Sequence, residues 1–237
     1  MKKIFKWLIG IAITLIVLTS AAFLIAKQIE YQPSKEASNA SENSTFVDDT
    51  YKFQGDNSKP VIIFYPGALV EPRSYSIWAS ILAKNGYTVY IAKFPLNLAV
   101  VDANAAKRVQ SNHSYIIGGH SLGGTMAARY AAKNKKELRG VFFLASYPEK
   151  KGNLKNIKEP VLSITASNDG VLNKTNYKKA KKLLPKSTDY VEINGGNHAG
   201  FGSYGKQKGD NKADISNDDQ QRVIADILLH WLNGQVN

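Results

Sequence analysis

Short apolar runs alternate with amphipathic segments along the chain from residue 46 onward. Runs with little polar interruption predict buried strands, and they fall at residues 61–65, 87–92, 115–117, 140–145 and 160–165, with a final strand at 189–193. The segments between and after them predict helices at residues 75–84, 97–110, 126–133, 174–184 and 218–232. Strands and helices that alternate in this way form a largely parallel sheet with helices on both faces. The pattern therefore predicts an α/β fold.

The first 31 residues have a different pattern, with basic residues followed by a long apolar run. Lys2, Lys3 and Lys6 precede an uncharged segment from Trp7 to Ala26. At ~1.5 Å per residue, a helix of that length spans about 30 Å, the thickness of a bilayer core. We therefore predict one N-terminal transmembrane helix, with its basic end in the cytoplasm and the rest of the chain outside. A cleaved signal segment is the alternative, since Ser20-Ala21-Ala22 resembles a cleavage site.

Residues 32–45 are small and polar and show no apolar period. Such a composition is typical of a flexible linker. The sequence thus predicts three parts: a membrane anchor or signal segment over residues 1–31, a flexible linker over 32–45, and an α/β domain over 46–237. In this arrangement the domain is held at the cell membrane on its outer side, or is secreted if the leader is cleaved.

Composition excludes several kinds of chemistry. The chain has no cysteine, which excludes disulfides, thiolate zinc sites and a thiol nucleophile. The formal net charge is +12, and lysines cluster over residues 174–186. We interpret this cluster as an exposed helix face and predict no nucleic-acid partner, because no recognition motif accompanies it. Acidic residues between 210 and 219 lack the glycine and terminal glutamate of a calcium-binding loop, so neither a metal nor a cofactor is predicted.

A serine follows the strand at residues 115–117, where the chain breaks on glycines. Gly119, Ser121 and Gly123 form the pattern G-x-S-x-G, directly before a helix-compatible segment. A serine raised on so sharp a turn is crowded by neighbouring chain two residues before and two after, where only glycine leaves room. The Leu122 N–H would lie at a helix N-terminus and could face a developing oxyanion. We interpret Ser121 as a nucleophile; a glycine-rich turn with an incidental serine is the alternative.

Two further polar residues follow later strands in the order that this chemistry needs. Asp169 comes after the strand at 160–165, and His198 comes after the strand at 189–193. Ligands in such sheets bind at the carboxyl ends of the strands. His198 is therefore the candidate base that takes the Ser121 proton, and Asp169 the candidate carboxylate that orients His198.

Each of these assignments has a structural alternative. Asp169 could cap the following helix, in which case Asp189 or Asp210 would be a substitute partner for His198. His198 could be a polar residue in a glycine-rich turn. Of the remaining histidines, His120 is expected to shape the serine turn, and His113 and His230 to be structural or solvated.

These residues together resemble the α/β-hydrolase superfamily, in particular its small lidless bacterial members near dienelactone hydrolase. The resemblance runs from about residue 59 to the end, on the motifs Tyr65-Pro66-Gly67-Ala68, Gly119-His120-Ser121-Leu122-Gly123-Gly124, Ser167-Asn168-Asp169-Gly170, Gly195-Gly196-Asn197-His198 and residues 201–210. Pro66-Gly67 stands where many relatives have His-Gly. The resemblance implies a catalytic triad of Ser121, Asp169 and His198, with the Ala68 N–H as the second oxyanion donor beside Leu122.

The function expected from this resemblance is that of a membrane-tethered extracytoplasmic serine hydrolase. It would be a carboxylesterase that acts on small ester substrates through an acyl-serine intermediate. An acyltransferase using the same triad is one alternative, and a non-catalytic binding module on the same scaffold is another. The connection at residues 147–159 is too short and polar to form an apolar lid. We therefore expect no cap domain and a preference for short acyl groups.

Overall fold

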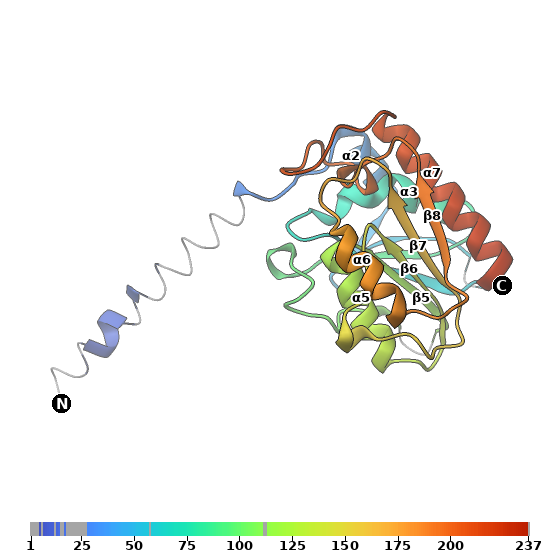
Figure 1. The fold of residues 1–237 in the computed structure, drawn as a ribbon. Coiled ribbons are helices and arrows are strands. Elements are labelled where there is room, and N and C mark those ends of the chain that lie inside the picture. Colours follow the sequence, from blue (N-terminus) through green and yellow to red (C-terminus); the bar gives the residue numbers. More distant parts are fainter. Residues whose placement is uncertain are drawn as a thin grey trace. The chain divides into compact units, whose positions relative to one another are not determined.

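The computed structural model describes residues 5, 7–11, 13, 14, 17, 28–56, 58–110 and 113–236. The chain divides into two compact units, Met1–Glu30 and Tyr31–Asn237 (Figure 1). Most of the predicted membrane anchor, Trp7–Ala26, lies outside the described residues. Within the part of the leader that is described, as elsewhere in the described chain, no helix is long and apolar enough to cross a bilayer.

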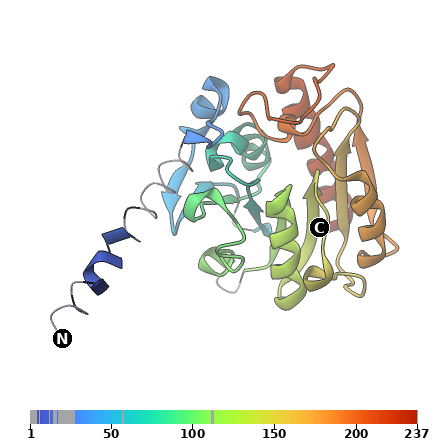
Figure 2. The same ribbon diagram turned by 60° about the vertical axis from the view of Figure 1, so that its left-hand side comes forward.

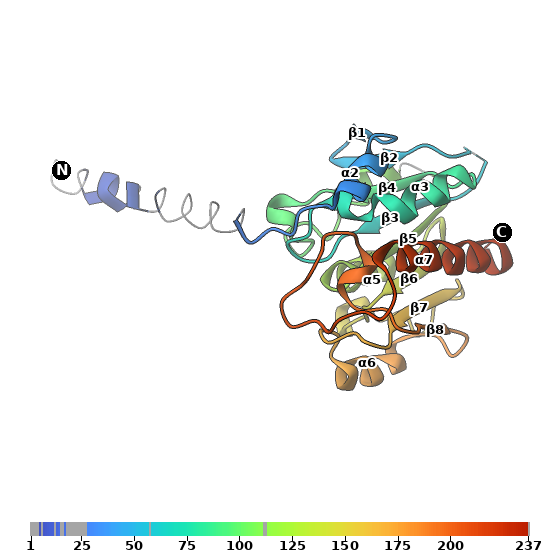
Figure 3. The same cartoon turned by 90° about the horizontal axis from the view of Figure 1, so that it is seen from above.

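The second unit is built on one sheet of eight strands in the order β1-β2-β4-β3-β5-β6-β7-β8, which Figure 3 shows from one edge to the other. The strands are β1 (Thr45–Val47), β2 (Thr50–Phe53), β3 (Val61–Tyr65), β4 (Val89–Ala92), β5 (Tyr115–His120), β6 (Leu138–Leu144), β7 (Val161–Ala166) and β8 (Asp189–Ile193). All pairings from β4 to β8 are parallel, whereas β1 and β2 form an antiparallel edge. The predicted, mostly parallel α/β sheet is confirmed.

Helices cover both faces of this sheet (Figures 1 and 2). They are α2 (Lys35–Ser41), α3 (Ser76–Lys84), α4 (Lys107–Gln110), α5 (Leu122–Lys133), α6 (Lys174–Ala180) and α7 (Asn217–Trp231), with a short 3₁₀ turn, η1 (Pro72–Tyr75), before α3. Side chains of α3 and α7 pack in one core, and side chains of α5 pack in another on the opposite face. The central strands therefore bury both their faces.

Strand β3 shows why a continuous apolar run suits this position. Ile62 and Phe64 belong to the core under α3 and α7, whereas Ile63 and Tyr65 belong to the core under α5. Successive side chains of a strand point to opposite faces, so a strand covered on both sides needs apolar residues at every position.

The segment predicted as a flexible linker is instead ordered. Helix α2 forms within it, and Ser34 caps the helix by accepting a hydrogen bond from the Ala37 N–H. The Ser34 N–H donates to the Ser203 carbonyl at 2.7 Å, and the Tyr31 N–H donates to the Leu69 carbonyl at 2.8 Å. The composition did not predict this helix. A cap and hydrogen bonds to distant segments stabilise it, and such contacts leave no apolar periodicity in the sequence.

The hairpin of β1 and β2 at the edge of the sheet was not predicted.

The helix predicted over residues 97–110 is limited in the structure to α4. Leu96 and Asn97 have φ angles of 54° and 50°, in the left-handed region that interrupts a helix. The Tyr65 hydroxyl accepts a hydrogen bond from the Ala106 N–H and donates one to the Ala103 carbonyl. These contacts with a buried side chain shape the segment as a loop.

The connection between β6 and β7 contains only a short 3₁₀ turn, η3 (Lys150–Gly152). No helix pair or hairpin rises from it over the ends of the strands, and all of its residues are described. The expectation that this domain lacks a cap is confirmed.

Candidate active site

Ser121 occupies the sharp turn between β5 and α5, in a backbone conformation that is rare for a non-glycine residue. Its φ and ψ angles are 52° and −123°. A Cβ atom at Gly119 would lie 2.6 Å from the Gly123 carbonyl carbon, and one at Gly123 would lie 2.1 Å from the Tyr65 carbonyl oxygen. Both distances are far inside van der Waals contact. The expectation that only glycine fits on either side of the serine is therefore confirmed.

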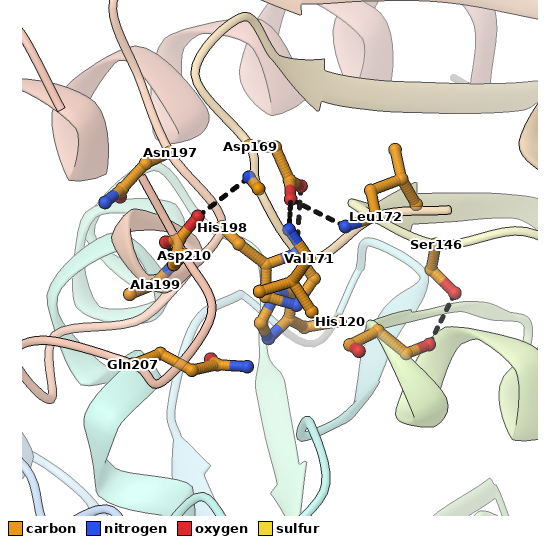
Figure 4. A network of polar contacts seen from close by, with 12 residues as sticks. His120, Ser146, Asp169, Val171, Leu172, Asn197, His198, Ala199, Gln207 and Asp210 are labelled. Carbon is orange, nitrogen blue, oxygen red and sulfur yellow. Dashed lines mark hydrogen bonds and ion pairs between the residues drawn. The ribbon is translucent and has the colours of Figure 1, made fainter. Parts of the chain in front are cut away.

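The end of β6 and the residues that follow it hold this strained turn in place. The Ser121 N–H donates to the Leu144 carbonyl at 3.1 Å, and the Ser146 hydroxyl donates to the Ser121 carbonyl at 2.5 Å (Figure 4). Such a conformation costs about 1–3 kcal/mol and persists only where the surroundings enforce it. Hydrogen bonds to both the N–H and the carbonyl of Ser121 supply that restraint. Sequence reasoning did not identify Ser146.

Asp169 and His198 come from separate loops and meet in a buried hydrogen bond. Nδ1 of His198 lies 2.8 Å from Oδ2 of Asp169, and the two residues are 1% and 3% exposed. The other oxygen of Asp169 accepts hydrogen bonds from the Val171 and Leu172 N–H groups, each at 2.8 Å (Figure 4). Asp169 therefore both caps the turn after β7 and orients the histidine.

The two substitute carboxylates considered for this role lie elsewhere. Asp189 is exposed and begins β8, at the opposite end of that strand from His198. Asp210 is close to the pair, but its oxygens accept hydrogen bonds from backbone N–H groups. The geometry therefore favours Asp169 as the partner of His198.

The outer nitrogen of His198, Nε2, is buried and has no hydrogen-bond partner among the described residues. The structure thus brings Asp169 and His198 together, but it does not join the Ser121 hydroxyl to His198 by a hydrogen bond. Hydrogen bonds of this kind are often long in the absence of substrate and tighten when it binds. A neutral His198 that donates from Nδ1 to Asp169 keeps Nε2 free to accept a proton.

His120 connects the serine turn to the loop after β3. The Gly67 N–H donates to the Tyr75 hydroxyl at 3.0 Å, and that hydroxyl lies 2.9 Å from Nδ1 of His120. Burial, followed by the nearby His198, holds the pKa of His120 well below its ordinary value, so this imidazole is neutral. The Tyr75 hydroxyl and Nδ1 of His120 therefore form a hydrogen bond between two neutral groups. The prediction that His120 shapes this region agrees with these contacts, whereas Tyr75 was missed.

The two N–H groups expected to stabilise an oxyanion, those of Leu122 and Ala68, donate no hydrogen bond within the described chain. Leu122 is the first residue of α5, where an N–H has no partner within the helix. The Ala68 N–H, in the loop after β3, donates no hydrogen bond within the described chain. Tight packing explains the glycine before it, because a Cβ atom at Gly67 would lie 2.8 Å from Nδ1 of His120.

The loop that carries His198 is held from behind by the start of α7. Gln220 accepts a hydrogen bond from the Asn197 N–H at 3.1 Å and donates one to the Asn197 carbonyl at 2.9 Å. Gln221 donates to the Gly200 carbonyl at 2.7 Å. Both glutamines are buried, at 1% and 0% exposure. The sequence does carry one indication of this role. Both glutamines lie on the apolar side of an amphipathic helix, where a buried polar side chain needs a hydrogen-bond partner.

Comparison with known proteins identifies the family to which this fold belongs. The sequence pattern of the Alpha/beta hydrolase family matches residues 61–222, and no curated protein matches the chain. Solved structures with the same fold include a predicted CIB-like hydrolase from Thermoplasma acidophilum, 17% identical with a TM-score of 0.57, covering 76% of this chain and 91% of that one. The esterase domain of a Rhodothermus marinus protein is 14% identical with a TM-score of 0.60, covering 79% and 93%. Dienelactone hydrolase from Anabaena variabilis is 14% identical with a TM-score of 0.59, covering 79% and 92%. At such identities these structures show a shared fold.

The family pattern spans strands β3 to β8, the serine turn and both loops that carry Asp169 and His198. The absence of a cap from the described domain agrees with the predicted resemblance to lidless members. This chain belongs to the Alpha/beta hydrolase family.

Proposed function

We propose that this protein is a serine hydrolase that cleaves small carboxylic esters through an acyl-serine intermediate. One observation carries the proposal. A buried carboxylate–imidazole pair, Asp169 and His198, accompanies a serine on a strained turn between β5 and α5. A serine needs an adjacent base to become a nucleophile, and that base needs a group to fix its tautomer.

In the proposed reaction, Nε2 of His198 takes the proton of Ser121 while the serine oxygen attacks the ester carbonyl carbon. The N–H groups of Leu122 and Ala68 stabilise the oxyanion, and Asp169 stabilises the imidazolium. The tetrahedral intermediate collapses, His198 gives its proton to the leaving alcohol, and the acyl group stays on Ser121. Water, deprotonated by His198, then attacks the acyl carbon. The second tetrahedral intermediate collapses as His198 returns the proton to the Ser121 oxygen, which releases the carboxylic acid.

The absence of a cap from the described domain supports a preference for short acyl groups. Burial of one methylene contributes about 0.8 kcal/mol, so a deep acyl pocket would favour longer chains several-fold per carbon. An open site offers little surface for that burial. The increase in kcat/KM with acyl chain length should therefore stop after the first few carbons. A panel of p-nitrophenyl esters from acetyl to palmitoyl tests this; kcat/KM that rises steadily with chain length would contradict it.

We also propose that the domain is tethered to the cell membrane on its outer side, or secreted if the leader is cleaved. The support is the run from Trp7 to Ala26 behind three lysines. A membrane-spanning segment should keep the protein in the membrane fraction through a high-salt wash. Protease added to intact cells should degrade the domain. Protection from that protease would contradict the outward orientation.

The function is tested by labelling with a fluorophosphonate probe and by ester hydrolysis. Ser121→Ala should abolish labelling and lower kcat by several orders of magnitude with little change in folding. The matched control is Ser187→Ala, because Ser187 is exposed and outside the site. Equal activity of wild type and Ser121→Ala would reject the assignment. Adding a short alcohol to the assay separates hydrolysis from acyl transfer, since a transferase would form a new ester.

A further inference from the structure

Asp210 bridges the two loops that supply the candidate acid and base. One oxygen of its carboxylate, Oδ1, accepts hydrogen bonds from the Gly170 N–H at 3.0 Å and the Asn211 N–H at 2.9 Å. The other oxygen, Oδ2, accepts from the Ala199 N–H at 2.8 Å. Figure 4 shows Asp210 beside Ala199, close to Asp169 and His198. Two of these three donors, Gly170 and Ala199, directly follow Asp169 and His198 in the chain.

This bridge joins segments that the sheet alone does not position. Strands β7 and β8 are adjacent and parallel, so their following loops emerge at the same edge. The Asp210 segment lies directly on the first loop, because a Cβ atom at Gly170 would be 2.8 Å from the Gly209 carbonyl oxygen. Gly209 has a φ of 85°, which turns the chain immediately before the carboxylate. Backbone shape and side-chain bonds therefore both direct Asp210 to this place.

We propose that Asp210 is a positioning residue that holds Asp169 and His198 at bonding distance; the inference rests on the proposed function. It acts through the backbone and touches neither reacting atom. A carboxylate suits the task because both of its oxygens accept hydrogen bonds, and bonds to a charged acceptor are the stronger kind. Asparagine would supply one acceptor and place an NH₂ group against a backbone N–H. Asp210→Asn must therefore lose a bond to one of the two loops.

The matched control is Asp214→Asn, which removes the same charge from the same loop. The Asp214 carboxylate is exposed and accepts a hydrogen bond from the side-chain amide of Asn168 at 2.8 Å. Asp210→Asn should lower kcat for an acetyl ester about 10- to 100-fold, since misplacement by about 1 Å can cost that much, while KM changes less than about three-fold. Asp214→Asn should keep kcat within about two-fold of the wild-type value. If the two variants behave alike, the proposal is overturned.

A proton NMR measurement tests the same idea without any substrate. The His198 Nδ1–H signal, which reports the bond to Asp169, should be lost or broadened in Asp210→Asn and retained in Asp214→Asn and Ser121→Ala. An unchanged signal in Asp210→Asn overturns the positioning role. A changed signal in a protein whose wild type hydrolyses no ester supports the positioning role and rejects the proposed function.

The wild-type protein provides a further test if Asp210→Asn fails to fold. The amide protons of Gly170 and Ala199 share one carboxylate as acceptor. Both amide nitrogens should therefore show through-hydrogen-bond coupling to the Asp210 carboxyl carbon. Absence of either coupling would show that the bridge does not exist in solution.

Discussion

The Tyr75 hydroxyl lies 2.9 Å from Nδ1 of His120 and accepts the Gly67 N–H at 3.0 Å. Through this hydroxyl, the loop after β3 is joined to the end of β5, immediately before Ser121. Tyr75 is fully buried, and burial raises its pKa, so the hydroxyl remains protonated and can act as donor and acceptor at once. The relative position of the serine and the Ala68 N–H depends on this link.

Tyr75→Phe should therefore impair both stability and turnover. It leaves the buried Gly67 N–H and His120 Nδ1 without their partner, at a cost of about 1–3 kcal/mol in the free energy of unfolding. Turnover should fall about ten-fold, because the Ala68 N–H, the proposed oxyanion donor, is displaced. Denaturant unfolding and kcat on an acetyl ester measure the two effects. Tyr177→Phe is the control, since it loses a hydrogen bond to Ser163 and spares the site; an equal loss of turnover in both variants would contradict the prediction.

Asp169→Asn separates the two roles of this side chain. Asparagine can still accept from the Val171 and Leu172 N–H groups, so the turn after β7 should remain capped. Its NH₂ group would face Nδ1 of His198 and force the wrong tautomer, as in other enzymes of this chemistry, where kcat falls by about 10⁴. The expected result is a large loss of kcat with a small change in melting temperature. Asp189→Asn is the control and should change neither kcat nor the melting temperature. A near-normal kcat in Asp169→Asn would show that Asp169 caps the turn without orienting His198.

Gly123→Ala should disrupt the serine turn. The added methyl would lie 2.1 Å from the Tyr65 carbonyl oxygen and 2.2 Å from the Pro66 carbonyl oxygen, both of them backbone atoms. Because the backbone must move, the free energy of unfolding should fall by about 1–3 kcal/mol. Fluorophosphonate labelling should also be lost. Gly234→Ala, where nothing lies within 4 Å of the added atom, is the control. Normal labelling of Gly123→Ala would mean that the turn is less constrained than its packing indicates.

Stability should fall as the solution is made acidic, and His120 should account for part of the fall. Burial keeps this histidine neutral in the folded state, whereas in the unfolded chain it takes up a proton below pH ~6.5. The unfolded state then binds more protons, so the free energy of unfolding decreases as pH falls. For this one group the decrease from pH 7 to pH 5 is at most about 2 kcal/mol. His120→Gln should flatten the dependence measured by urea unfolding, and His113→Gln, at an exposed position, should leave it unchanged. An identical pH slope in both variants would contradict this origin.

Short-range sequence patterns were enough to predict the serine turn and the two loops that carry Asp169 and His198. The glycines around Ser121 are required by contacts within a few residues and with the adjacent strand end, so their spacing is visible in the sequence. Asp169 and His198 were found because parallel strands bring their carboxyl ends to one edge, whatever the details of packing. The apolar runs likewise predicted β3 to β8, because burial on both faces leaves a continuous pattern.

The sequence by itself thus determined the α/β sheet, the glycine-flanked serine and the order of the three candidate residues. Only the tertiary structure decided that α2 is ordered, that residues 97–106 form a loop, and that Asp210, Gln220 and Tyr75 make hydrogen bonds between the segments around the candidate site. The physical reason is the range of the interactions. Periodicity and steric exclusion act between near neighbours and leave a local pattern, whereas a single hydrogen bond between segments 40 residues apart, such as Asp210 to Gly170, leaves none.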